Sequence, residues 1–212
     1  MNHEHWLNKW QDNNIKFHLS ETYELLVKYV TLLPTGKVLV PLCGKSLDML
    51  WLIHHGYEVV GVELSPIACT DFFSENNIPF TTKKVDKFTV YEAPQIQIWC
   101  GDMFQLPSAA CSGVTAIYDR AALFALPADM RQTYAQYIKK LVKSLSNVKI
   151  LLVTIEFDDK KLEGPPFYVS AAEVRRLYGD MFTIEELESY NVSGFKNGER
   201  FKNIAVKDHI HY

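Results

Sequence analysis

Residues 38–63 read VLVPLCGKSLDMLWLIHHGYEVVGVE, and this stretch decides the fold. A short apolar run leads into a turn around Gly44, an amphipathic segment, a second apolar run and an acidic residue. This order predicts a strand, a tight turn, a helix and a second parallel strand that ends at Glu63. The backbone N–H groups of such a turn face a ligand at the start of the helix, with the acid beside them. We expect the turn to hold one end of a nucleoside-like ligand, while an exposed Glu63 accepts hydrogen bonds from the two ribose hydroxyls.

Apolar runs and helical stripes alternate along the rest of the chain. We expect strands at residues 38–42, 58–63, 88–91, 96–99, 114–118 and 149–155, and two less buried strands within 182–192 and 200–207. We expect helices after the caps Ser20, Ser65 and Ser170, after the turn at Gly44, and along the apolar stripe from Met130 to Leu145. The pattern predicts one α/β domain over residues 1–212. It is a doubly wound, Rossmann-like sheet of about seven strands with an antiparallel terminal hairpin.

Composition excludes several classes of protein. The 212 residues are 48% hydrophobic and 22% charged, with a net charge of −3, so nucleic acid and anionic membranes are not expected partners. No run reaches the roughly 18 apolar residues of a membrane-spanning helix, and no secretory signal is apparent. The four cysteines form no C-x-x-C pair, which is typical of reduced thiols in the cytoplasm. The histidine pairs have no cysteine or carboxylate at ligand spacing, so no metal is expected.

Three aromatic residues near the N-terminus must pack on something, because Trp6, Trp10 and Phe17 are costly to leave in water. They fit either a staple over the edge of the sheet or a lid over a ligand, formed by residues 1–20.

The ends of five predicted strands carry the candidate functional residues. In an open parallel sheet the ligand lies outside the carboxyl ends of the strands. Those ends are Leu42–Gly44, Glu63, Asp102–Met103, Asp119–Arg120 and the loop 156–168. Taken singly, Gly44 could be a turn residue, Asp102 a cap, and Arg120 a structural partner of Asp119 or Asp102. Their position at one edge of the sheet favours a nucleoside site.

Two phosphate-binding motifs are incomplete in this region. A phosphate-binding loop that ends in Gly44-Lys45-Ser46 would need glycine where Leu39 stands, and a dinucleotide fingerprint would need glycine in place of Leu42. S-adenosylmethionine, a nucleoside without phosphate, tolerates the bulkier turn better than NAD does. No G-x-S-x-G elbow supports acyl chemistry.

Several segments together resemble one family. They are WLNKW (6–10), KFH (16–18), PLCGKSLDMLWL (41–52), VVGVELS (59–65), IYDRAAL (117–123) and GPPFYV (164–169). In this order, over nearly the whole chain, they resemble the thiopurine S-methyltransferase family in its short bacterial form. The resemblance implies a class I methyltransferase fold, S-adenosylmethionine as donor, and a cytoplasmic, monomeric enzyme.

The resemblance also assigns residues. The cofactor contacts that it implies are Trp10, Leu42, Gly44, Glu63, Asp102, Met103 and Arg120, with Trp6 nearby. The acceptor would be bordered by Phe17, Pro165, Pro166 and Phe167, and by Arg120, the expected catalytic residue. Animal members have a second active-site arginine near the C-terminus, for which Lys196 and Arg200 are the candidates here.

The acceptor stays open at this point. It is a small thiol or another soft nucleophile: an aromatic or heterocyclic thiol, an inorganic selenium or tellurium species, halide or thiocyanate. Two functions of other classes are an NAD(P)-dependent oxidoreductase, disfavoured by the missing glycines, and a non-catalytic nucleoside-sensing domain.

Overall fold

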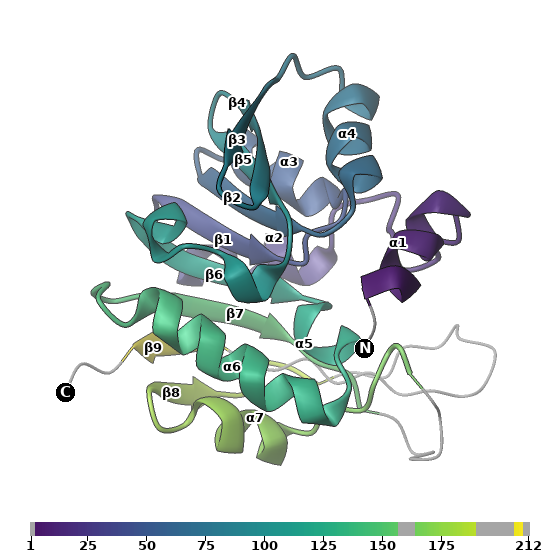
Figure 1. Cartoon of the computed structure of the whole chain (residues 1–212). Helices are drawn as coiled ribbons and strands as arrows, with labels where there is room; N and C mark the ends of the chain where they lie inside the picture. The colour runs from purple at the N-terminus through teal and green to yellow at the C-terminus, as the bar shows by residue number, and fades with distance from the viewer. Residues whose placement is uncertain (1–2, 157–163, 190–205, 210–212) are drawn as a thin grey trace.

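The computed structural model describes residues 3–156, 164–189 and 206–209, and within these ranges nine strands form one mixed sheet (Figure 1). Their order is β3-β4-β5-β2-β1-β6-β7-β9-β8. The strands are β1 (Lys37–Pro41), β2 (Glu58–Glu63), β3 (Thr81–Val85), β4 (Phe88–Ala93), β5 (Ile96–Cys100), β6 (Val114–Arg120), β7 (Lys149–Val153), β8 (Phe182–Glu185) and β9 (Val206–His209).

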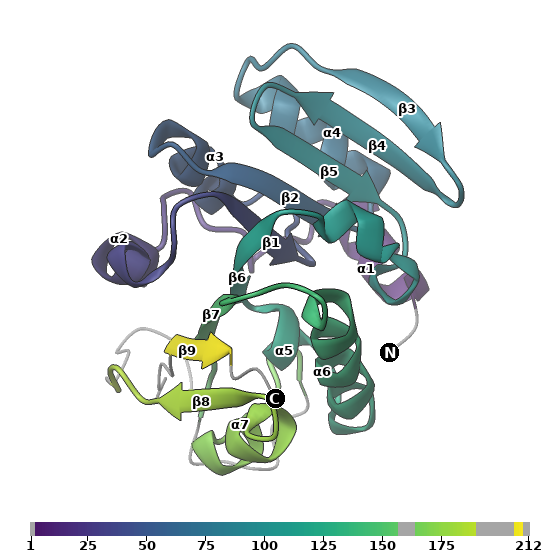
Figure 2. The ribbon, with the colours of Figure 1, turned by 90° about the vertical axis from the view of Figure 1, so that its left-hand side faces the viewer.

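The centre of the sheet is parallel. β5, β2, β1, β6 and β7 run in one direction, and β1 pairs with β2 from Lys37 opposite Glu58 to Pro41 opposite Val62. Helices cover both faces of these strands, which explains their near-continuous apolar sequence. The outer strands β3, β4, β9 and β8 are antiparallel to their neighbours. Figure 2 shows how the sheet twists between the β3–β4 edge and the β8 edge.

The helices form two layers and one outlying element. They are α1 (His3–Gln11), α2 (Glu24–Tyr29), α3 (Leu47–His54), α4 (Pro66–Glu75), α5 (Ala122–Ala125), α6 (Ala128–Val142) and α7 (Ala171–Tyr178), with 3₁₀ turns η1 (Val30–Leu32), η2 (Met103–Gln105) and η3 (Ser108–Cys111). One core cluster joins α6 and α7 to one face of the sheet, and a second joins α2, α3 and α4 to the other face (Figure 1). α1 lies outside both layers, next to α4. No helix in the described ranges is long and apolar enough to cross a membrane.

Most predicted elements are confirmed. The doubly wound sheet is present, and eight of its nine described strands, all except β3, correspond to predicted strands, with β8 and β9 as the antiparallel pair at one edge. Residues 200–205 of the predicted last strand lie outside the described ranges. Ser65 caps α4 by accepting a hydrogen bond from the Ala68 N–H, and Ser170 caps α7 through the Glu173 N–H.

Two predictions of local structure are incomplete or wrong. β3 was not expected, because an exposed edge strand of sequence TTKKV has no apolar alternation and is set by its pairing with β4. Ser20 does not cap the next helix. α2 begins only at Glu24, after Tyr23, which makes no side-chain cap hydrogen bond. Instead, the Tyr23 N–H donates to the Asp48 carboxylate at 2.8 Å, a contact that the local sequence does not reveal.

Candidate active site

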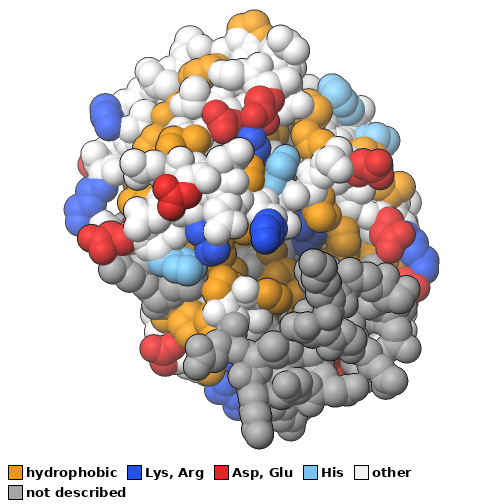
Figure 3. Space-filling view, turned by 90° about the vertical axis from the view of Figure 1, so that its right-hand side faces the viewer, with side chains coloured by type: hydrophobic (Ala, Val, Ile, Leu, Met, Phe, Trp, Pro, Cys, Tyr) orange, Lys and Arg blue, Asp and Glu red, His pale blue; other side chains and the backbone are white. Residues whose placement is uncertain are grey.

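The carboxyl ends of β1, β2 and β5 are joined by backbone hydrogen bonds. The Cys43 N–H after β1 donates to the Val62 carbonyl at 3.0 Å, and the Gly101 N–H after β5 donates to the Glu63 carbonyl at 2.8 Å. The turn, the acid and the segment that carries Asp102 therefore lie side by side. Figure 3 looks at the side toward which these strands point, where charged and histidine side chains surround exposed hydrophobic ones. We call this edge of the sheet the rim.

Glu63 lies against the turn, as the sequence predicted. Its Oε2 accepts a hydrogen bond from the Gly44 N–H at 2.9 Å, and its Oε1 accepts one from the Ser65 N–H at 2.8 Å. The expectation of an exposed carboxylate is wrong, because Glu63 is only 6% exposed. Burial raises the pKa of Glu63, and the backbone N–H donors partly offset that rise. A buried acceptor with few fixed donors suits a ligand that brings hydroxyl groups.

The turn has a special backbone. Leu42 and Gly44 both have positive φ, 46° and 52°, which turns the chain sharply between β1 and α3. At Gly44 a side chain would also meet the N-terminal segment, because a Cβ there would lie 3.1 Å from Cζ2 of Trp10. Glycine thus lets an aromatic ring approach the turn closely.

The N-terminal aromatic residues cover the rim. Trp10 is 5% exposed and lies over Gly44. The ring of Phe17 makes edge-to-face contacts with Trp6 at 5.5 Å and with Trp10 at 5.6 Å between centroids. The segment therefore packs over the Gly44 turn and against α4; its role as a lid over a ligand stays a prediction.

Arg120, at the end of β6, forms an ion pair that the sequence did not suggest. Its Nε donates to Asp48 Oδ2 at 2.8 Å and its Nη2 donates to Ser46 Oγ at 3.3 Å. Its guanidinium also lies over the ring of Tyr23, 5.5 Å from the centroid. The prediction that Arg120 would pair with Asp119 or Asp102 is therefore wrong, because its partner is Asp48. Burial lowers the pKa of Arg120, but the charge and hydrogen bond of Asp48, together with the nearby Tyr118 and Tyr23, outweigh burial, so the pKa is raised overall.

Asp119 faces away from Arg120, because successive residues of a strand point to opposite faces of a sheet. Its Oδ1 accepts hydrogen bonds from the backbone N–H groups of Ala122 and Leu123, and its Oδ2 accepts one from the Tyr134 hydroxyl at 2.8 Å. Asp119 therefore holds α5 and α6 and is not among the side chains that face the rim.

Asp102 and Met103 follow β5 at the rim. Asp102 caps η2 by accepting a hydrogen bond from the Phe104 N–H at 2.9 Å, and its Oδ2 lies 3.9 Å from His3 Nε2 in α1. Met103 is 3% exposed, and its side chain belongs to the core. This leaves its backbone as the part that could face a ligand.

Lys45 is not available as a phosphate-binding lysine. It is 8% exposed, and its Nζ contacts Glu75 at 2.7 Å and Asp71 at 3.4 Å, both in α4. These ion pairs connect the turn to α4, in agreement with the absence of a complete phosphate loop. His18 lies near this pair, and burial together with the charge of Lys45 lowers the pKa of its imidazole.

The segment with Pro165, Pro166 and Phe167 reaches the rim beside α5. The Phe167 N–H donates to the Phe124 carbonyl at 2.7 Å, which places the segment next to the element that follows Arg120. The ring of Phe167 lies over Gly164, where a Cβ would be 2.6 Å from the ring atoms. Lys196 and Arg200, the candidates for a second basic residue, lie outside the described residues.

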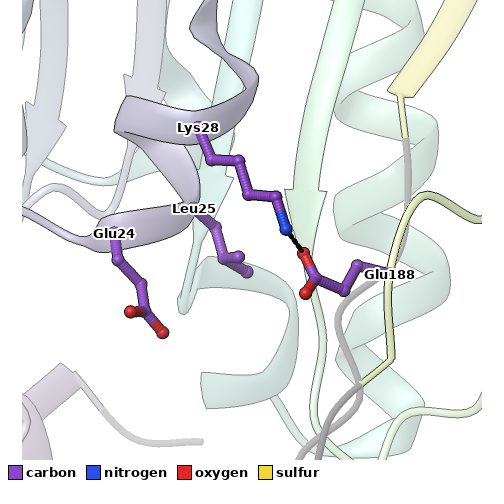
Figure 4. Close-up of a pocket in the computed structure, with 4 residues that line it drawn as sticks. All are labelled: Glu24, Leu25, Lys28 and Glu188. Atoms are coloured by element: carbon purple, nitrogen blue, oxygen red, sulfur yellow. Dashed lines mark hydrogen bonds and ion pairs between the residues drawn. The ribbon is translucent and has the colours of Figure 1, made fainter.

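Other features of the described residues lie apart from the rim. No group of three or more histidine, cysteine or acidic side chains in these ranges could hold a metal ion. Figure 4 shows a pocket of about 170 Å³ between α2 and the segment after β8, lined by Glu24, Leu25, Lys28 and Glu188. The Lys28–Glu188 ion pair of 2.6 Å crosses it, and this contact lowers the pKa of Glu188. The pocket contains none of the strand-end residues.

Sequence reasoning missed Asp48, Ser46 and Tyr118 as neighbours of Arg120. Asp48 stands in the first turn of α3, where a carboxylate is usually explained by the positive end of the helix. Its signal was that an acid interrupts the otherwise apolar run LDMLWLI on a helix covered by core residues.

Comparisons with known proteins identify the family and the fold of this chain. The family model for thiopurine S-methyltransferase matches residues 1–211. A thiopurine S-methyltransferase from Pseudomonas fluorescens is 43% identical over 92% of this chain and 89% of its own length, and one from Pseudomonas syringae is 47% identical over 80% and 77%. A SAM-dependent methyltransferase structure from Anabaena variabilis is 17% identical, with a TM-score of 0.69 over 99% of this chain and 96% of that one.

The fold is that of the class I methyltransferases, which use S-adenosylmethionine as methyl donor. Within that class, the chain belongs to the thiopurine S-methyltransferase family.

Proposed function

We propose that the protein binds S-adenosylmethionine at the rim and transfers its methyl group to the sulfur of a small aromatic or heterocyclic thiol. The observation that carries this proposal is the contact of the Glu63 carboxylate with the Gly44 N–H at 2.9 Å. It places a carboxylate that can accept hydrogen bonds from hydroxyl groups beside a turn that lacks the glycines of a phosphate-binding loop. Trp10 covers that turn.

The residues at the rim suit the proposed donor, which supplies a methyl group on a positively charged sulfur when bound. Glu63 would accept hydrogen bonds from the ribose hydroxyls, and Asp102 with the Met103 backbone would border the base. Leu42, Gly44, Trp10 and Trp6 would enclose the remainder. Lys45 is engaged with α4, so the turn offers no free lysine to a phosphate, which disfavours NAD(P).

The acceptor side would be formed by Phe17, Arg120 and the Pro165–Phe167 segment. Transfer from a sulfonium to a thiolate combines a cation with an anion, so a dry aromatic surround favours the less charged transition state over water. Arg120 is a permanent cation and would stabilise the thiolate form of the acceptor rather than remove its proton. The main task of the chain is then to hold the acceptor sulfur in line with the methyl carbon.

Two experiments test the proposal. Titration calorimetry should show binding of S-adenosylmethionine and S-adenosylhomocysteine and none of NADH. Labelled methyl transfer should then be measured on a panel of thiols, halides, thiocyanate and selenite, with the fastest turnover expected for an aromatic thiol. Failure to bind S-adenosylmethionine would contradict the proposed site, whereas faster turnover of selenite or a halide would replace only the acceptor.

We further propose that the enzyme is a cytoplasmic monomer. A single species of 24.4 kDa in light scattering would support the monomeric state.

A further inference from the structure

Asp48 connects three parts of the molecule that are far apart in sequence. It lies in the first turn of α3, and its side chain is 2% exposed. Its Oδ1 accepts a hydrogen bond from the Tyr23 N–H at 2.8 Å. Its Oδ2 accepts one from Arg120 Nε at 2.8 Å and one from the Tyr118 hydroxyl at 3.0 Å. With Ser46, these residues make up what we call the Asp48 cluster.

The contacts of the cluster fix the direction of the Arg120 side chain. A guanidinium is a rigid plane, so a hydrogen bond from Nε to Asp48 and another from Nη2 to Ser46 set its orientation. The Tyr23 ring lies against the same group. Nη1 takes part in neither contact, and Arg120 stands at the carboxyl end of β6, where the proposed acceptor lies.

Stability alone is a weak explanation for this arrangement. Removing a carboxylate and a guanidinium from water costs several kcal/mol per ion, and well-packed apolar residues often do as well as a buried ion pair. The Arg120 side chain is 13% exposed, so the pair has little help from solvent. What the pair gives that apolar residues could not give is a cation with a defined orientation at the rim.

We propose that Asp48 is a positioning residue: it orients Arg120 toward the methyl acceptor and ties that orientation to the start of α2 through Tyr23. The inference rests on the proposed function, because Arg120 must act on the acceptor. Asp48 would act only through Arg120, because it is buried and its two oxygens accept hydrogen bonds from Tyr23, Arg120 and Tyr118.

A double-mutant cycle tests this role. Asp48→Asn keeps the size of the side chain, but its amide cannot accept from both Tyr23 and Arg120 as the carboxylate does. We expect kcat to fall on the order of 10- to 100-fold, since a displaced reacting group costs up to that much, while the calorimetric Kd for S-adenosylmethionine stays within about twofold. In the Arg120→Ala background, Asp48→Asn should cause no further fall in kcat. The matched control is Glu58→Gln, which neutralises an exposed carboxylate at the opposite end of β2, outside the Asp48 cluster, and should leave kcat unchanged.

A second readout does not depend on turnover. 4-Nitrothiophenol can be bound to the protein together with S-adenosylhomocysteine. The visible absorption of its anion, 4-nitrothiophenolate, then reports the ionisation of the bound thiol. The apparent pKa of the bound thiol should rise in both Asp48→Asn and Arg120→Ala. If Asp48→Asn does not fold, Asp48→Glu keeps the charge but moves the carboxylate by one methylene, and it should show the same fall in kcat and the same rise in the pKa of the bound thiol.

The outcomes separate this inference from the proposed function. Falls in kcat that multiply in the double mutant would mean that Asp48 acts independently of Arg120, and would overturn the inference. An unchanged kcat in Arg120→Ala would overturn the role of Arg120 as well. A wild-type protein without methyl transfer would contradict the proposed function itself.

Discussion

At the scale of single residues, Glu63 shows how one side chain serves both fold and ligand. Its carboxylate accepts hydrogen bonds from Gly44 and Ser65, and it is 6% exposed. Glu63→Ala should weaken binding of S-adenosylmethionine on the order of 100-fold, because it removes the acceptor for two ribose hydroxyls. It should also reduce the free energy of unfolding by about 1–3 kcal/mol, since two buried N–H groups lose their partner.

Calorimetry and chemical denaturation measure the two effects of Glu63→Ala separately. The control is Glu58→Ala at the opposite end of β2, where the carboxylate is 61% exposed and lies 3.5 Å from Lys37. Glu58→Ala should change neither quantity by much. An unaltered Kd in Glu63→Ala would show that the ribose binds elsewhere.

At the scale of elements, Trp10 holds α1 on the rim. It is the buried residue of a helix whose other positions are exposed or half-buried. Trp10→Ala should therefore release α1 and speed proteolysis within residues 3–17, and it should weaken S-adenosylmethionine about tenfold, a loss of about 1.4 kcal/mol. Leu19→Ala, which changes an exposed apolar residue of the same segment, is the control. Equal proteolysis of both variants would show that Trp10 does not fasten α1.

The contact between α6 and α7 depends on a buried ion pair. Arg131 Nε and Nη2 donate to the two oxygens of Glu173 at 2.7 and 3.0 Å, and its Nη1 donates to the Leu126 carbonyl. Glu173→Gln should cost about 3–5 kcal/mol in chemical denaturation, because Arg131 stays buried without its counter-charge. Arg176→Ala removes an exposed side chain 3.8 Å from the same Glu173, and it should cost less than about 1 kcal/mol. Similar losses in both variants would contradict this account.

The elements also show what the sequence could and could not predict. α4 was predicted at its first residue, because Ser65 and Pro66 are local signals that act on adjacent N–H groups. The start of α2 was missed, because the Tyr23 N–H is satisfied by Asp48, 25 residues away. The strand-end rule located Glu63 and Arg120 but not the partner of Arg120. Strand alternation separates it from Asp119, and only the packing of α3 brings Asp48 to it.

At the scale of the whole molecule, three fully buried tyrosines make the fold sensitive to alkali. Burial raises the pKa of Tyr118, Tyr134 and Tyr178 well above 10.0. Their stabilising effect is complete below pH 10 and is lost as the pH rises above it, because only the unfolded chain ionises there. The free energy of unfolding falls by about 1.4 kcal/mol per pH unit for each tyrosine, or about 4 kcal/mol per pH unit for the three together. A typical free energy of unfolding of about 5–15 kcal/mol is therefore lost within a few pH units. The phenolate absorbance of these three tyrosines should appear together with the loss of circular dichroism in one cooperative step, after the more exposed tyrosines have ionised. Tyr134→Phe should reduce the slope by about 1.4 kcal/mol per pH unit, and titration of these three tyrosines near pH 10 in the folded protein would contradict this account.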